Sequence, residues 1–172
     1  MTFGMKTRTR IGCWNVKTTM EITKLAQIYK ERNVYHIEFL DLSENRWNGS
    51  REHRIPQGGI PLYSGKPVNE KHESGVEILL SRKAHKFLMK WKLISDSIIM
   101  ARFLTKLRKL VVIQCYALTE QATTEEKHSF YETLQNTLRN VKRSEITMIM
   151  GDLYAKVVAY NKRFENTTED TA

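Results

Sequence analysis

Three apolar runs of strand character each end on a residue that offers an oxygen ligand, and this pattern constrains the fold more than any other feature. The runs cover residues 10–15, 39–44 and 148–152, and they end on Asn15, Glu44 and Asp152. Short apolar runs bounded by turn signals are typical of buried strands, and sites supported by a rigid scaffold are often built in the loops that follow. The three end residues are therefore a candidate oxygen-ligand cluster for a metal ion or a reacting phosphate.

Strand and helix patterns alternate along the rest of the chain. Two long helices are predicted at residues 18–33 and 123–141, each opening on a capping box, Thr18 with Glu21 and Thr123 with Glu126. Strands are predicted at residues 9–16, 35–42, 61–64, 75–81, 92–95, 98–104, 110–117 and 146–152, with a short basic helix at 82–90.

The order of these elements indicates one domain. The opening strand–helix–strand unit implies parallel neighbours in one sheet, because a helical return connection brings the second strand back in the same direction. In the second long helix, an apolar stripe is expected to face the core: Phe130, Leu134, Leu138 and Val141. We therefore expect a single α/β (α+β) domain at residues 7–158, followed by a polar, frayed tail at residues 159–172.

The charge balance narrows the class of partner. The chain has 172 residues, of which 41% are hydrophobic, and 28 Lys and Arg against 19 Asp and Glu give a net charge of +9. This length and composition are typical of a globular domain with a real core. The basic excess favours a polyanionic partner, most simply DNA bound nonspecifically through its phosphates. An ordinary basic domain is the alternative.

Other features exclude some classes of protein. No apolar run approaches the roughly 20 residues that a membrane helix needs, and the N-terminus lacks the apolar core of a signal peptide. An intracellular location, nuclear or cytoplasmic, is therefore expected. Cys13 and Cys115 lie within apolar runs without zinc-site spacing, so they are expected to be buried, reduced thiols with no role in catalysis.

Four blocks, in this order, resemble the motifs of the endonuclease/exonuclease/phosphatase superfamily. They are CWNV from residue 13, LSENRW from residue 42, QCYA from residue 114 and GDLYAKV from residue 151. Three intermediate blocks are LYSG from residue 62, SGV from residue 74 and EEKHSFY from residue 125. They are similar to a narrower group, the apurinic-type endonuclease domain of RTE-class non-LTR retrotransposons, which includes endonuclease–reverse transcriptase and craniofacial development protein 2-like sequences. The resemblance covers roughly residues 7–157.

The resemblance implies a four-layer αββα sandwich that hydrolyses DNA phosphodiesters with Mg²⁺ or Mn²⁺. In this family pattern Glu44 corresponds to the principal metal ligand and Asn15 to its neighbour in the metal and phosphate network. Tyr116 corresponds to the tyrosine that contacts the scissile phosphate, and Asp152 to the aspartate that positions the attacking water. These four residues are the predicted catalytic set.

Two neighbouring residues are predicted to contact substrate. Arg46 occupies a place where the family often has a phosphate-contacting base. Trp47 could stack on a nucleobase or simply cover the foot of its own loop.

The sequence also departs from the family pattern. Tyr154 replaces the asparagine of the GD-x-N motif, and the family's late Asp-His pair has no counterpart in this sequence. The resemblance therefore implies a truncated and degenerate endonuclease domain, with its C-terminal part missing and little or no activity by itself.

Three functions remain open at this point. The chain could be a Mg²⁺-dependent endonuclease, alone or as part of a longer product, or a catalytically inactive remnant that binds nucleic acid nonspecifically. A small-molecule phosphatase is disfavoured by the positive charge. Without its later strands the domain would expose sheet edges, so self-association or a partner that supplies the missing half is expected.

Overall fold

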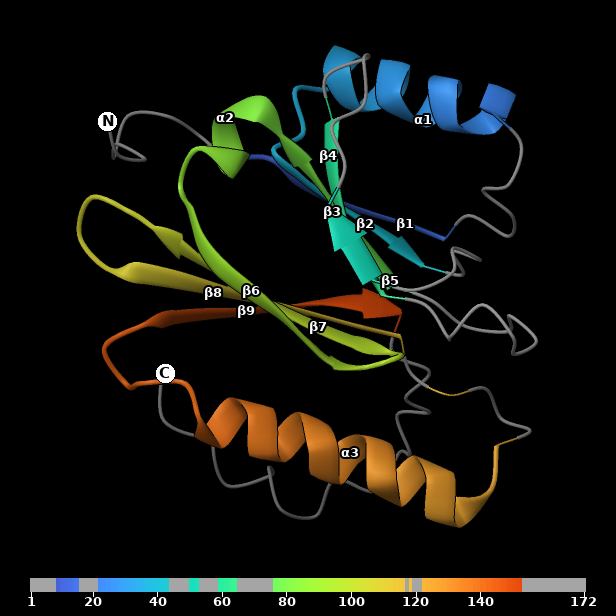
Figure 1. Ribbon diagram of the computed structural model, residues 1–172, viewed down its shortest axis with the longest axis vertical. Coiled ribbons are helices and arrows are strands. Elements are labelled where there is room, and N and C mark those ends of the chain that lie inside the picture. The colour runs from blue at the N-terminus through green and yellow to red at the C-terminus, as the bar shows by residue number, and fades with distance from the viewer. Residues whose placement is uncertain are drawn as a thin grey trace, which may run out of the picture.

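Two β-sheets pack face to face, and one long helix covers the outer face of each (Figure 1). This computed structural model describes residues 9–15, 22–43, 50–52, 59–64, 76–116, 118 and 122–152. Helix α1 (Ile22–Val34) packs on the first sheet and helix α3 (Thr124–Arg139) on the second. The predicted order of layers, helix–sheet–sheet–helix, is confirmed.

The first sheet has five strands in the order β1-β2-β5-β4-β3. Their bounds are β1 Ile11–Asn15, β2 Phe39–Ser43, β3 Ser50–Glu52, β4 Gly59–Ser64 and β5 Val76–Ser81. Strand β1 pairs with β2 in parallel, so the predicted strand–helix–strand opening is confirmed. The remaining pairs in this sheet are antiparallel.

The second sheet has the order β6-β7-β8-β9 and follows the short helix α2 (Arg82–His85). Its strands are β6 Leu88–Ser95, β7 Ile98–Leu104, β8 Lys109–Tyr116 and β9 Ile146–Asp152. Strands β8 and β9 are parallel, and α3 forms the crossover between them. The predicted strand at residues 146–152 has the bounds that the sequence indicated.

Two apolar layers hold the sheets and α3 together. Between the sheets, the rings of Phe39 and Phe103 meet edge to face, with their centroids 4.9 Å apart. On the outer face of the second sheet, Phe130 and Leu134 of α3 are buried against β8. The predicted capping box is also present, since Thr123 N donates to Glu126 Oε2 at 2.8 Å. The apolar stripe of α3 is therefore core, as predicted.

Several boundaries predicted from the sequence are wrong. The second strand begins at Phe39 and not at residue 35, because the chain turns at His36, which has a φ of 52°. The basic helix predicted at 82–90 ends at His85, and β6 begins at Leu88. Strand β3 was not predicted, because its polar residues carry no apolar alternation.

Cys13 is exposed, contrary to the prediction of a buried thiol. Strand β1 is the outer strand of its sheet, so its side chains are covered from fewer directions. Cys115, on an inner strand, is buried as predicted.

The capping box predicted at Thr18 and Glu21 lies outside the described residues. Within the described part of the chain, no helix is long and apolar enough to cross a membrane.

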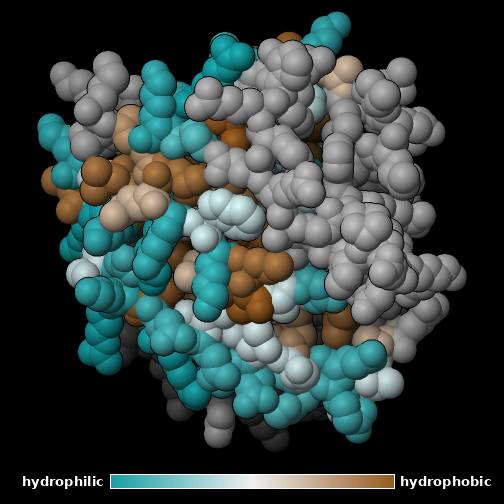
Figure 2. All heavy atoms as spheres, viewed as in Figure 1, coloured by the Kyte–Doolittle hydropathy of each residue, from teal (hydrophilic) through white to brown (hydrophobic). Residues whose placement is uncertain are grey.

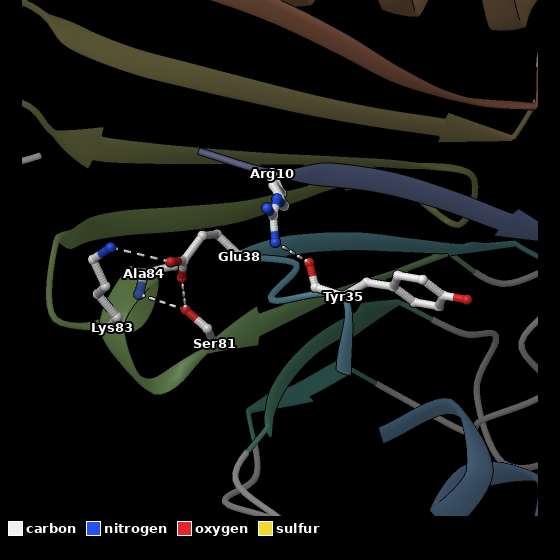
Figure 3. A network of polar contacts seen from close by, with 6 residues as sticks. All are labelled: Arg10, Tyr35, Glu38, Ser81, Lys83 and Ala84. Carbon is white, nitrogen blue, oxygen red and sulfur yellow. Dashed lines mark hydrogen bonds and ion pairs between the residues drawn. The ribbon is translucent and has the colours of Figure 1, made fainter. Parts of the chain in front are cut away.

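A polar network fixes the start of β2 and the end of β5 (Figure 3). Glu38 accepts hydrogen bonds from the Ser81 hydroxyl and, at 3.2 Å, from Lys83 Nζ. The Ser81 hydroxyl in turn accepts from Ala84 N at 2.9 Å and caps α2. Beside it, Arg10 Nη1 donates to the Tyr35 carbonyl at 3.0 Å. These contacts set the register of the first sheet at the end opposite the candidate site.

A buried carboxyl group lies between the first sheet and α1. Glu77 of β5 is 1% exposed, and burial raises its pKa to about 8. Burial also raises the pKa of the neighbouring Tyr29, and the charge of Glu77 raises it further. Because the folded-state pKa of Glu77 exceeds the unfolded value, the folded domain binds this proton more tightly than the unfolded chain does. The stability from this proton is complete below about pH 4.5 and is lost as the pH rises through about 8.

The substitution Glu77→Gln should remove this pH dependence. Since one pKa unit corresponds to about 1.4 kcal/mol, the free energy of unfolding of the original protein should fall by about 4 kcal/mol between pH 5 and pH 8.5, relative to that of the variant. Urea unfolding at the two pH values measures this difference. The exposed Glu132→Gln serves as the matched control and should shift neither value; a Glu77→Gln variant with the same pH profile as the original would contradict the burial argument.

Candidate functional site

The sheet register brings the predicted site residues to the ends of four strands. Asn15, the last residue of β1, pairs with Ser43 of β2, and Glu44 follows Ser43 in the sequence. Tyr116, the last residue of β8, pairs with Asp152 of β9. Each sheet therefore contributes one adjacent pair of strand ends.

A buried hydrogen bond connects these two sheets just before the strands end. Gln114 Nε2 of β8 donates to the Asp41 carboxylate of β2 and, at 3.2 Å, to the Leu42 carbonyl. Asp41 and Gln114 are both 0% exposed. Unpaired polar groups are costly in a core, so this contact specifies how β2 and β8 lie against each other. Tyr116 and Ser43 each lie two residues farther along these strands.

A second contact joins the outer strands β1 and β9. The pKa of the Cys13 thiol is raised, chiefly by partial burial, while a hydrogen bond with the backbone of Gly151 lowers it to a smaller extent. Asp41 also lies close enough to Cys13 to raise the pKa of this thiol. In Figure 1 the arrows of β2 and β9 point to the same side of the molecule. The four strands thus end together at one edge of the sandwich.

Gly151 allows the last residues of β8 and β9 to approach closely. Its φ is 139°, a conformation that side chains disfavour, and a Cβ placed there would lie 1.7 Å from the carbonyl oxygen of Cys115. The glycine of the GD motif is therefore required by the backbone at the point where Asp152 follows.

Tyr116 is anchored within the core and is 5% exposed. Its backbone N–H donates to the Ser97 carbonyl at 3.0 Å, which ties the end of β8 to the turn before β7. The position of this phenol is therefore set by the sheet and not by a mobile loop.

Neither thiol has the properties of a nucleophile. Burial, followed by the charge of Asp41, raises the pKa of Cys115 to about 12. The pKa of Cys13 is also raised, chiefly because its thiol is partly withdrawn from water although the residue as a whole is exposed. A reactive cysteine needs a lowered pKa, so both groups remain protonated thiols at neutral pH.

The structure fixes only part of the predicted set. The backbones of Asn15 and Asp152 are placed, whereas Glu44, Arg46 and Trp47 lie outside the described residues. Among the described residues, no three His, Cys, Asp or Glu side chains are grouped as a metal site would require.

Sequence reasoning missed Asp41 and Gln114 as the link between the sheets. The signal was a single polar residue inside each of two otherwise apolar strands, FLDLS and KLVVIQCY. Buried polar side chains are nearly always hydrogen-bonded, so two such residues in one domain are candidates for a mutual contact.

Comparison with known proteins identifies relatives of this chain. No family model matches the chain. Craniofacial development protein 2 of Bos taurus is 33% identical over 147 residues, which are 86% of this chain and 24% of the relative. The Tragulus javanicus protein of the same name is 32% identical over the same length. The chain thus spans about a quarter of the curated relatives that it matches.

Solved structures share the fold at low sequence identity. The endonuclease domain of TRAS1, a telomere-specific non-LTR retrotransposon, has a TM-score of 0.60 at 13% identity, covering 87% of this chain and 62% of that domain. D. rerio TDP2, complexed with a single-strand DNA product, has a TM-score of 0.59 at 12% identity, covering 81% and 58%.

A third solved structure carries the superfamily name. An endonuclease/exonuclease/phosphatase family protein from Leptotrichia buccalis has a TM-score of 0.54 at 11% identity, covering 84% of this chain and 66% of that one. The chain accordingly has part of the endonuclease/exonuclease/phosphatase fold and is homologous to craniofacial development protein 2.

Proposed function

We propose that the edge where β1, β2, β8 and β9 end is the metal- and phosphate-binding part of a DNA endonuclease site. The observation that carries this proposal is the paired register, which sets Asn15 beside the residue before Glu44 and Tyr116 beside Asp152. The buried contact of Gln114 with Asp41 supports it, because this contact holds the two pairs against each other.

The donor set suits a hard divalent cation. Mg²⁺ takes one or two carboxylates and otherwise keeps water and substrate oxygens, so Glu44 with the Asn15 amide would be sufficient. When bound, such an ion would polarise the phosphoryl oxygen and offset the negative charge that develops there. The site is thus chemically consistent with phosphodiester hydrolysis.

Residues of the chain itself would contact the phosphate and activate the attacking water. Tyr116 would donate a hydrogen bond to a non-bridging phosphate oxygen as negative charge develops on it. Asp152 would orient the attacking water and accept its proton. Arg46 would contact the neighbouring phosphate. The burial of Tyr116 supports this assignment, because a donor held in place before reaction stabilises the transition state most.

Binding without hydrolysis is the second candidate. It is favoured by Tyr154, which stands where the superfamily motif has an asparagine and cannot supply an amide. The net charge of +9 supports nonspecific contact with phosphates in either case.

Mn²⁺ titration tests the site independently of activity. Paramagnetic Mn²⁺ should broaden the backbone amide signals of Tyr116 and Asp152 in NMR spectra. Glu44→Gln should weaken the Mn²⁺ affinity by at least about 10–100-fold, the loss seen when even a supporting partner of a metal ligand is removed.

The control replaces a carboxylate elsewhere. Glu125→Gln, in the exposed first turn of α3, should leave the Mn²⁺ affinity unchanged. Equal broadening in the Glu44→Gln variant would show that Glu44 does not hold the metal.

A further inference from the structure

A groove of about 720 Å³ lies on the outer face of the second sheet, between β6 and the C-terminal half of α3. This volume is in the range of ligand-binding sites. Tyr116 packs between the two sheets, whereas this groove faces away from them. Figure 2 shows mostly hydrophilic side chains over α3, with a hydrophobic area beside them over β6. The groove is thus separate from the candidate site.

Positive charge is concentrated in this groove. Lys90 of β6 is directly opposite Arg102 of β7, and Lys92 lies two residues farther along β6. Like charges directly opposite each other in a sheet are destabilising unless something neutralises them. Arg102 is compensated by Glu145, with Nε 3.3 Å from Oε1. In the part of the chain that the structure describes, neither lysine has an ion-pair partner.

The rest of the lining supplies neutral hydrogen-bonding groups and an apolar floor. Thr133 and Asn136 of α3 and Asn140, which caps its C-terminal end, line the groove together with the lysines, while Ile94 and Met100 contribute from the sheet. No carboxylate is among the lining residues within the described ranges. Lysine, arginine, asparagine and threonine side chains are the usual partners of nucleic-acid phosphates. The lining is therefore complementary to a phosphodiester backbone.

The direction of β6 connects the groove to the candidate site. Ser95, at the end of β6, pairs with Ile98, which pairs with Cys115 next to Tyr116. At about 3.3 Å per residue, Lys92 lies about 10 Å back from this end and Lys90 about 17 Å. A polynucleotide strand that leaves the site along the β6 edge would meet the two lysines in succession.

We propose that this groove binds the phosphodiester backbone of a single nucleic-acid strand, so that the bound strand extends beyond the candidate site. The inference rests on the proposed function for the identity of the ligand, but it does not depend on metal binding or hydrolysis. Phosphate contacts would hold the strand without reading its sequence.

Salt-dependent binding of a fluorescent oligo-dT 30-mer tests the groove. Each phosphate contact with a single strand contributes about 0.7 to the slope of log K against log salt. The double variant Lys90→Gln/Lys92→Gln should therefore lower the magnitude of the slope by about 1.4. In addition, Asn136→Asp should weaken binding, and Asn136→Lys should strengthen it.

The matched control removes two charges elsewhere. Lys30→Gln/Lys86→Gln changes two exposed lysines outside the groove by the same net charge. Its slope should stay close to that of the original protein. An equal fall in both double variants would show that total charge, not the groove, governs binding, and would overturn the proposal.

The two proposals fail in different ways. An unchanged slope in Lys90→Gln/Lys92→Gln, with Mn²⁺ broadening retained at Tyr116, would overturn the groove alone. Loss of Mn²⁺ broadening together with the expected fall in slope would overturn the metal site and support the groove. Binding of an acidic peptide but not of oligo-dT would overturn the nucleic-acid assignment.

Discussion

Replacing Gly151 by alanine should destabilise the domain by more than about 3 kcal/mol. The φ of 139° is nearly inaccessible to a residue with a Cβ, and strained backbone alone costs about 1–3 kcal/mol. The added Cβ would also lie 1.7 Å from the Cys115 oxygen and 2.8 Å from its carbonyl carbon. These are backbone atoms, so no rotamer change relieves the contact. The ends of β8 and β9 would have to separate, and Tyr116 would lose its register with Asp152.

Chemical unfolding measures this effect, and Gly12→Ala is the matched control. A Cβ at Gly12 would meet the side-chain ends of Ile37 and Leu40 at 3.2 Å, which flexible groups can relieve by small shifts. Gly12→Ala should therefore cost far less than Gly151→Ala. Similar unfolding midpoints for the two variants would show that the close approach of β8 and β9 is not required.

Local patterns predicted the elements whose signals lie within one stretch of sequence. The capping box at Thr123 and the apolar stripe through Phe130 defined α3, because both depend on residues three or four positions apart. The apolar run at residues 146–152 defined β9 in the same way. The order of such elements indicated an α/β (α+β) domain, and the resemblance implied the αββα sandwich.

Contacts between distant residues could not be predicted in this way. The link from Gln114 to Asp41 joins residues 73 positions apart, and its existence depends on how the sheets pack. The turn at His36 depends on a residue with positive φ that no glycine marks. Cys13 is exposed because β1 is an outer strand, which is a property of the sheet and not of its own sequence.

The candidate site depends both on local sequence signals and on contacts between distant residues. The residue types at the ends of strands selected Asn15, Glu44 and Asp152 before any topology was known, whereas Tyr116 was selected only through the family resemblance. Their adjacency was not readable, because it requires β1 to pair with β2 and β8 with β9 in the observed registers. The metal-binding role of Glu44 stays a prediction, since that residue lies outside the described ranges.

Residues 1–172 alone should not nick supercoiled plasmid in a Mg²⁺-dependent reaction. Tyr154 replaces an amide, and all five histidines precede Asp152, so the late Asp-His pair of the family has no counterpart here. Loss of a positioned acid–base group costs about 10²–10⁴ in rate, and loss of an oxyanion donor about 10²–10³. The two losses are not simply additive, but together they should leave little activity above background.

Completing the site should restore the reaction. A fusion of the Tyr154→Asn variant to the C-terminal half of a related endonuclease domain should nick plasmid with Mg²⁺ and not with EDTA. Tyr154→Asn without the fusion should stay inactive, because the histidine is still absent. Within the active fusion, Glu44→Ala should lower the nicking rate by at least about 10²-fold, whereas the exposed Glu125→Ala should not. Mg²⁺-dependent nicking by the unmodified chain that disappears in Glu44→Ala would instead identify residues 1–172 as a minimal nuclease.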